Sequence, residues 1–215
     1  MRSWRNWQTR TVQVRVGNRG GSNPLDRTIF FGGKYAETKD CIVGRRSIRK
    51  YLDRKITPKQ LEEIVSLASY APSWKNTQVT RYHGVFDERL KAKIADECVL
   101  GFVFNQKIIH RAPALVVVTY KHGISGYEKS GEESTNKGDK WEVFDAGIAT
   151  QTFSLAAHEL GYGTVIMGIF DDKKVAEALD LPEDEVVAAL VPVGFAEKEP
   201  AAPPRKEVSE LLTIR

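Results

Sequence analysis

The sequence has few cysteines and no long apolar run. Its two cysteines, Cys41 and Cys98, cannot build a disulfide framework, and neither belongs to a CxxC pair or another metal-ligand spacing. The strongest apolar run, residues 114–120, has the length of a buried strand and is too short to span a bilayer. We therefore expect a cytoplasmic protein that uses neither disulfides nor a membrane segment.

Histidines are also few, and their spacing does not suggest a metal site. The four are His83, His110, His122 and His158. The pair His158-Glu159 lacks the second histidine that a zinc-protease helix carries. We therefore expect no bound metal.

The basic charge of the chain is unevenly distributed. The net charge of +4 and the pI of about 9.0 would by themselves favour an acidic partner such as nucleic acid. Residues 1–40, however, contain eight Lys or Arg and three Asp or Glu, a net of +5. This leaves 24 basic and 25 acidic residues, a net of −1, for residues 41–215. We therefore expect no nucleic-acid partner for residues 41–215.

Residues 1–40 have the composition of a disordered leader. They contain six arginines and five glycines, without a sustained helical or strand period or the apolar stretch of a signal peptide. The segments Arg5-Asn6-Trp7-Gln8-Thr9-Arg10 and Gly21-Ser22-Asn23-Pro24 resemble translated fragments of bacterial tRNA genes. We expect the leader to be disordered, or to lie upstream of the true start of the protein. The alternative is a genuine basic tail that contacts RNA or an anionic surface.

From residue 41 onward the pattern predicts one α+β domain, residues 41–215. Helices are expected over residues 58–71, 87–94, 141–160 and 172–179, and strands over residues 79–86, 114–120, 164–167 and 186–195. Thr57, Pro58 and Gln60 form a capped helix start, and Asp87 is a second N-cap. Since helices and strands do not alternate as regular units, an α+β fold is favoured over a doubly wound sheet.

Two later segments carry functional expectations. Residues 121–140 are rich in Gly, Ser, Lys, Glu and Asn, which predicts a long exposed loop of the kind that closes over substrate sites. The helix over residues 141–160 is apolar around most of its circumference, which predicts that it is buried, partly in a subunit interface.

Arg45-Arg46-Ser47-Ile48-Arg49 places three guanidinium groups and a hydroxyl within five residues. Arginine forks match phosphate oxygens with paired hydrogen bonds. A basic run is also typical of a solvated surface, so this cluster alone leaves both interpretations open.

The order of several motifs resembles the nitroreductase family. The Arg-Arg-Ser-x-Arg element is followed by a capped helix that ends in Ala71-Pro72-Ser73-Trp74-Lys75-Asn76-Thr77-Gln78. Asn105 precedes the valine-rich strand, Asp145-Ala146-Gly147 opens a central helix that ends at Gly161, and Pro204-Arg205-Lys206 follows the last strand. The resemblance covers roughly residues 41–210.

The resemblance implies a nitroreductase-like fold, in which helices flank a central mixed or antiparallel sheet and two chains intertwine as a homodimer. It also implies FMN bound between the two subunits. The phosphate and ribityl chain would lie against Arg45, Arg46, Ser47, Arg205 and Lys206.

The other implied flavin contacts come from four further segments. Arg49 and Asn105 would face the pyrimidine edge of the flavin, and the main-chain N–H groups of Met167 and Gly168 would face N5. Pro72, Ser73, Trp74 and Asn76 would come from the other subunit. No catalytic side chain is assigned, because the chemistry takes place at N5 of FMN.

The function implied is an FMN-dependent NAD(P)H oxidoreductase. Hydride would pass in a ping-pong reaction from NADH or NADPH through FMN to a nitroaromatic, a quinone or a similar small electrophile. One alternative is a non-catalytic flavin or phosphate-ligand sensor or storage module on the same fold. The other is a nucleic-acid-binding protein that uses the basic leader.

Overall fold

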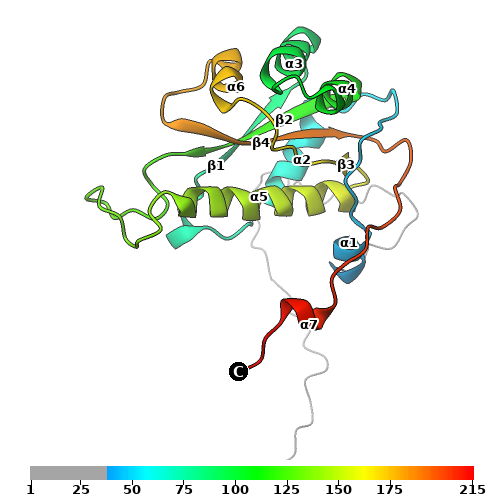
Figure 1. Cartoon of the computed structure of the whole chain (residues 1–215). Helices are drawn as coiled ribbons and strands as arrows, with labels where there is room; N and C mark the ends of the chain where they lie inside the picture. Colours follow the sequence, from blue (N-terminus) through cyan, green and yellow to red (C-terminus); the bar gives the residue numbers. More distant parts are fainter. Residues whose placement is uncertain (1–37) are drawn as a thin grey trace, which may run out of the picture. The chain divides into compact units, whose positions relative to one another are not determined.

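The computed structural model describes residues 38–215, so the predictions for residues 1–37 lie outside the described part. Its centre is a four-stranded sheet with the order β1-β2-β4-β3, in which every neighbouring pair is antiparallel (Figure 1). The strands are β1 (Thr80–Val85), β2 (Ala114–Lys121), β3 (Gly163–Thr164) and β4 (Glu185–Gly194). This confirms the predicted α+β class and the antiparallel sheet.

Helices cover both faces of the sheet (Figure 1). One face carries α2 (Pro58–Ala68) and α5 (Lys140–Glu159). The other carries α3 (Glu88–Lys93), the π-helical turn η3 (Ile94–Cys98), α4 (Val103–Arg111) and α6 (Asp172–Leu179). Because both faces are covered, Val116 and Val118 of β2 are buried on the α2 side, while Leu115 and Val117 are buried on the opposite side.

The predicted caps form. Thr57 Oγ1 accepts a hydrogen bond from the Gln60 N–H at 3.3 Å, and Gln60 Oε1 accepts one from the Thr57 N–H at 2.9 Å. Asp87 accepts from the N–H of Leu90 at 2.8 Å at the start of α3. These bonds satisfy main-chain donors that have no partner within the helix.

Three α-helices are not expected from the sequence: α1 (Thr38–Gly44), α4 and the short α7 (Val208–Leu211) near the C-terminus. α1 begins three residues before position 41, where the domain is expected to start. α4 follows Phe102, whose side chain makes no capping hydrogen bond. Because α4 begins without a capping motif, the feature that locates α2 and α3 does not locate α4.

The strand expected over residues 164–167 is shorter in the structure. β3 ends at Thr164, and its line of pairing resumes only at Met167, which pairs with Leu190. The register of the two strands places Val165 opposite Pro192. Proline has no N–H to donate, so the ladder is interrupted at this position.

The loop between β2 and α5 is anchored by a buried carboxylate. Glu142, which is fully buried, accepts hydrogen bonds from the N–H groups of Gly123 and Ile124 at 2.6 and 3.1 Å, and its Oε2 lies 3.0 Å from His122 Nδ1. The predicted exposed loop is therefore present and is fixed at its β2 end. After β4 the chain passes α1 and reaches α7 (Val208–Leu211), and residues 197–215 are exposed (Figure 1).

Candidate flavin site

The arginine cluster lies along the edge of the sheet. Ser47 forms a parallel bridge with Thr164, and the N–H of Ile48 donates to the carbonyl of Thr164 at 2.8 Å. Ile48 is 4% exposed and belongs to the core, so the residues before it are held in place. This pairing extends the sheet beyond β3 and fixes Arg45 and Arg46 beside it.

Arg45 and Arg46 line a cavity of about 140 Å³ at this edge. The other residues around it are Ile48, His158, Gly161, Tyr162, Gly163, Thr164, Ala196 and Glu199. Arg46 Nη1 donates to the carbonyls of Val43 and Gly44 at 2.6 and 3.1 Å, which caps the end of α1. Arg46 Nη1 also donates to the carbonyl of Arg45 at 3.0 Å. Within residues 38–215 the other guanidinium nitrogens of Arg46 and the guanidinium of Arg45 have no hydrogen-bond partner, so donors remain for an anion.

His158 is a cavity residue that sequence reasoning considered only as a metal ligand. It lies in the last turn of α5, where a cation is favoured by the helix dipole. An ideal Cβ on Gly44 would lie 3.0 Å from His158 Nε2, so the glycine that ends α1 leaves room for the imidazole. The position of a histidine at a helix C-terminus, three residues before Gly161-x-Gly163, is the sequence signal for this contact.

The basic residues expected to join this cavity are not all beside it. Arg205 and Lys206 lie on the exposed segment after β4 and do not line the cavity; Lys206 is 4.0 Å from Glu210. Arg49 is exposed and donates to the carbonyl of Ser47 at 3.2 Å. Within one chain, therefore, the structure brings Arg45 and Arg46 together and leaves Arg205 and Lys206 apart from them.

The expectation for Met167 needs a correction. Its N–H donates to the carbonyl of Leu190 at 2.8 Å, and its own carbonyl accepts from the N–H of Leu190 at 3.1 Å. Both main-chain polar groups of Met167 are therefore hydrogen-bonded to β4. The next N–H groups, those of Gly168 and Ile169, have no hydrogen-bond acceptor within the described part of the chain. Asn105, which is buried, donates to the carbonyl of Ile169 at 3.4 Å and so supports this segment.

The loop after α2 has an unusual backbone. Lys75, Asn76 and Gln78 have φ values of 45°, 57° and 51°, in the left-handed region that favours glycine. Each such residue costs about 1 to 3 kcal/mol when it is not glycine. Ser73 Oγ accepts from the N–H of Gln78 at 2.9 Å and closes the loop. Such backbone strain is concentrated at functional sites, which agrees with the role expected for this segment.

This loop is attached to the N-terminal end of α5. Asp145 Oδ2 accepts from the N–H of Trp74 at 2.9 Å, and the rings of Trp74 and Trp141 lie 4.7 Å apart. The salt bridge between Lys75 Nζ and Glu128, at 2.8 Å, joins it to the next loop. That hydrogen bond from Lys75, with a second from Ser134, holds the pKa of Glu128 below its usual range.

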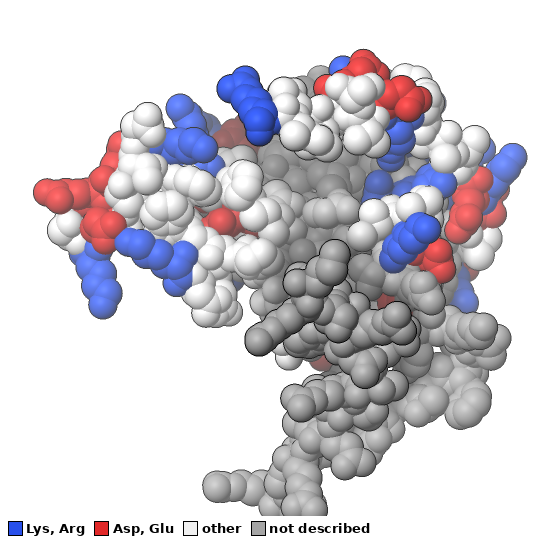
Figure 2. Space-filling view, turned by 90° about the horizontal axis from the view of Figure 1, so that it is seen from below, with Lys and Arg blue, Asp and Glu red and all other residues white. Residues whose placement is uncertain are grey.

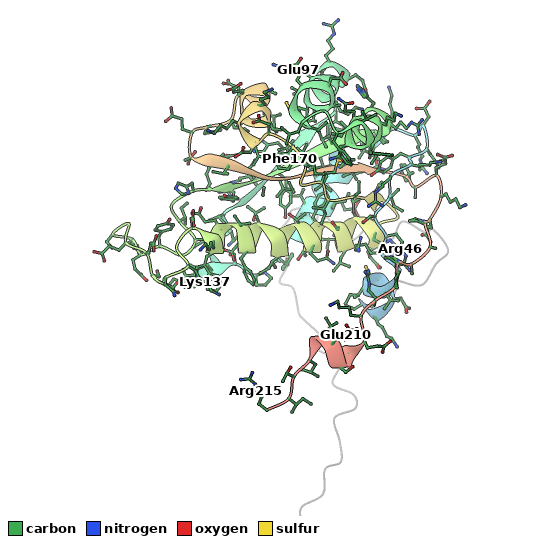
Figure 3. The ribbon with its side chains drawn as sticks, in the orientation of Figure 1. Arg46, Glu97, Lys137, Phe170, Glu210 and Arg215 are labelled. Carbon is green, nitrogen blue, oxygen red and sulfur yellow. The ribbon has the colours of Figure 1, made fainter. Side chains whose placement is uncertain are left out.

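The arginine cavity and the Trp74 loop lie at opposite ends of α5. Arg46 lies beside the C-terminal end of α5, whereas Lys137, just before α5, lies at the other end (Figure 3). A helix of 20 residues is about 30 Å long. The Trp74 loop is bonded to α5 at Asp145, and the cavity is lined by His158, 13 residues further along the helix, which is about 20 Å away, so within one chain the two groups of predicted flavin contacts lie apart.

The first half of α5 has an exposed stripe, which ends at Gln151. Val143, Phe144, Gly147 and Gln151 are exposed at helical spacing, and Phe144 is 58% exposed. On the coloured part of the surface in Figure 2, basic and acidic side chains are interspersed. The four exposed residues of the stripe are themselves uncharged.

The other groups considered for chemistry are structural in the described residues. Both cysteines are free and buried. Burial raises the pKa of the Cys41 thiol, the carboxylate of Glu159 raises it further, and Arg45 opposes them.

Among residues 38–215, no three His, Cys, Asp or Glu side chains gather as metal ligands do. None of the helices in this range combines the length and hydropathy needed to cross a bilayer.

These features define an α+β protein with an arginine-lined cavity at the edge of its sheet. The sequence matches the model of the nitroreductase family over residues 42–195, and the chain belongs to that family. It is 33% identical over 167 residues to an Archaeoglobus fulgidus protein described as a candidate NADH dehydrogenase/NAD(P)H nitroreductase, an alignment covering 76% of this chain and 87% of the relative.

Two further comparisons extend this result. The chain is 29% identical over 182 residues to a Bacillus subtilis FMN reductase [NAD(P)H], covering 79% of this chain and 70% of that one. A solved structure of a nitroreductase candidate from Exiguobacterium sibiricum, in complex with FMN, matches with a TM-score of 0.72 at 21% identity, covering 84% of this chain and 98% of that one. The latter likeness shows the nitroreductase fold.

Proposed function

We propose that residues 41–215 form an FMN-dependent NAD(P)H oxidoreductase domain that works as a homodimer in the cytoplasm. The observation that carries the proposal is the cavity lined by Arg45 and Arg46 at the edge of a nitroreductase-family sheet. The relatives named as an FMN reductase and as a candidate NAD(P)H nitroreductase support the choice of cofactor and electron donor.

The residues at the cavity suit the phosphate of FMN. Two guanidinium groups and the imidazole of His158 line the cavity and supply several donors for a dianion, and Ser47 follows Arg46 directly in the chain. Downstream, the N–H groups of Gly168 and Ile169 are free to face N5, and Asn105 supports the backbone beside them. When bound, FMN supplies the redox chemistry by accepting hydride from NADH or NADPH and passing it to a second substrate.

The work of the protein is orientation and electrostatics. Arginine side chains hold the phosphate end, and main-chain donors stabilise negative charge near the reacting part of the ring. No side-chain acid or base is assigned to the reaction. We propose a nitroaromatic, a quinone or a similar small electrophile as the acceptor.

The homodimer follows from the two ends of α5. Asp145, which holds the Trp74 loop, and His158, which lines the arginine cavity, are about 20 Å apart along this helix, and this separation favours a site in which a second chain supplies one of the two groups. If two α5 helices pack antiparallel through the exposed Val143–Gln151 stripe, the Trp74 loop of one chain approaches the cavity of the other. In such a dimer the segment after β4 can pack against the partner through its exposed apolar residues Val208, Leu211 and Ile214. The same segment carries Arg205 and Lys206, the two further residues expected at the FMN phosphate.

The test is anaerobic reduction of the purified protein. Loaded with FMN, it should bleach at the flavin bands on addition of NADH or NADPH, and an acceptor should restore the absorbance. A protein that does not bind FMN would refute the proposal. A protein whose bound FMN is reduced by neither nucleotide would instead favour the sensor or storage alternative.

A further inference from the structure

Asp145 attaches two loops to α5 at one buried point. Its Oδ2 accepts hydrogen bonds from the main-chain N–H of Trp74, at 2.9 Å, and from the hydroxyl of Ser125. Asp145 is 2% exposed, so both bonds form away from water, where a charged acceptor binds donors strongly. The carboxylate thus fixes the loop of residues 73–78, and the loop before α5, relative to the same helix.

The other contacts between these loops are weaker. The side chains of Lys75 and Glu128 are 55% and 50% exposed, and exposed ion pairs contribute little to stability. The hydroxyls of Thr77 and Ser125 lie 3.4 Å apart, a long hydrogen bond. Asp145 therefore provides the strongest polar contact between the 73–78 loop and the rest of the fold.

The 73–78 loop also needs such a contact to keep its shape. Three of its residues, Lys75, Asn76 and Gln78, have positive φ values. In addition, Trp74 Nε1 is buried without a hydrogen-bond partner in the described structure. A loop with these features would relax if it were free, and the hydrogen bond that the Trp74 N–H donates to Asp145 holds it in place.

We propose that Asp145 is the positioning residue for the flavin site of the other subunit, an inference that rests on the proposed function. Ser73, Trp74 and Asn76 are the flavin contacts expected from this loop, and the phosphate cavity of the same chain lies at the far end of α5. Asp145 of one chain therefore orders contacts to the flavin whose phosphate is held by Arg45 and Arg46 of its partner. Its own side chain does not touch the cofactor.

The first experiment compares three variants of the full chain by the FMN dissociation constant. Asp145→Ala should raise this constant about tenfold, because the Trp74 N–H loses a charged acceptor. Asp145→Asn should rescue most of the loss, because its amide oxygen can still accept from Trp74. Glu185→Gln is the matched control, a buried carboxylate that accepts from Thr119 and His83 at 2.9 and 2.7 Å and serves neither loop.

Glu185→Gln should change FMN binding less than twofold. The inference is overturned if Asp145→Ala weakens FMN binding no more than this control does. It is also overturned if Asp145→Asn is as damaging as Asp145→Ala, since any buried change at Asp145 would then have the same effect. If Asp145→Ala does not fold, the comparison of Asp145→Asn with Glu185→Gln still decides, with about a threefold difference expected.

The second experiment uses hybrid dimers. One chain carries Asp145→Ala, and the other carries Arg45→Ala with Arg46→Ala; two different affinity tags select the hybrid. If Asp145 acts on its partner, one of the two sites receives both substitutions and the other receives none. The hybrid should then show about half of the wild-type NAD(P)H oxidation per dimer, well above either parent homodimer.

If Asp145 served the cavity of its own chain, both sites of the hybrid would be damaged and activity would stay at the parental level. Such a result, with an active wild-type protein, overturns only this inference. A wild-type protein that neither binds FMN nor oxidises NAD(P)H overturns the proposed function as well.

Discussion

The N–H of Ile48 donates to the carbonyl of Thr164 at 2.8 Å, and this bond connects the arginine cluster to the sheet. The contact depends on the residue before Thr164. An ideal Cβ on Gly163 would lie 2.5 Å from Cγ1 and 2.7 Å from Cβ of Ile48, too close for any side chain. Gly163 therefore permits the close approach that places Arg45 and Arg46 at the cavity.

Gly163→Ala should damage both stability and FMN binding. The added methyl must push Ile48 away, which should cost about 1 to 3 kcal/mol in the free energy of unfolding, measured by urea denaturation. Gly84→Ala is the control, because its Cβ would meet the flexible end of Leu61, at 2.6 Å, and the edge of the Phe86 ring, at 3.3 Å, both away from the cavity. We expect Gly84→Ala to lower stability without weakening FMN binding. Equal FMN affinities for the two variants would contradict the role assigned to Gly163.

Arg45→Ala should weaken FMN binding about 10- to 100-fold, which corresponds to the loss of a hydrogen bond to a charged group. The dissociation constant should also become less sensitive to salt, because one charge fewer attracts the phosphate. Arg89, exposed on α3, provides the control for a general loss of positive charge. If Arg89→Ala and Arg45→Ala weaken FMN equally, the anion is not bound at the cavity.

Local signals in the sequence located much of this fold. Helix starts were located by capping bonds that span only three residues, at Thr57 and Asp87. Strands β2 and β4 were located by their runs of buried valines. α4 lacks such a signal, so it was not found. The early end of β3 depends on Pro192, which is remote in sequence and becomes its neighbour only when the sheet register is known.

The candidate site shows the same division. The Arg45-Arg46 pair and the Trp74 loop were identified by the order of residue types. Met167 is hydrogen-bonded to Leu190, and Trp74 is hydrogen-bonded to Asp145. The partners in each pair are distant in sequence, so no local pattern specifies these contacts. His158 was visible in the sequence, but its value as a cavity residue depends on the end of α5 meeting α1.

Tyr82 should make stability fall at high pH. Burial raises the pKa of its phenol from 10.0 to about 12, and its hydroxyl donates to the carbonyl of Ala149 at 3.3 Å. Between these values the unfolded chain releases the proton while the folded chain keeps it, so the free energy of unfolding decreases as pH rises from 10 to 12. Tyr82→Phe should flatten the decrease over this interval, measured by urea denaturation at each pH. If the free energy of unfolding of Tyr82→Phe fell with pH as steeply as that of the wild type, groups other than Tyr82 would cause the loss of stability.

Phe144→Glu should separate the subunits. Phe144 is 58% exposed in the single chain and lies on the α5 stripe proposed to pack against its partner. A carboxylate buried there would be desolvated without a partner, so the dimer dissociation constant should rise at least 100-fold. Analytical ultracentrifugation over a range of concentrations measures this change, and circular dichroism checks that the chain remains folded.

The same variant connects assembly to the site. Each flavin is proposed to need the cavity of one chain and the Trp74 loop of the other, so dilution of Phe144→Glu should release FMN as the dimer dissociates. Leu100→Glu is the matched control, because Leu100 is 64% exposed and lies beyond η3, on the other side of the sheet. A Phe144→Glu protein that becomes monomeric yet keeps FMN with wild-type affinity would mean that one chain suffices for binding, and the shared site would have to be abandoned.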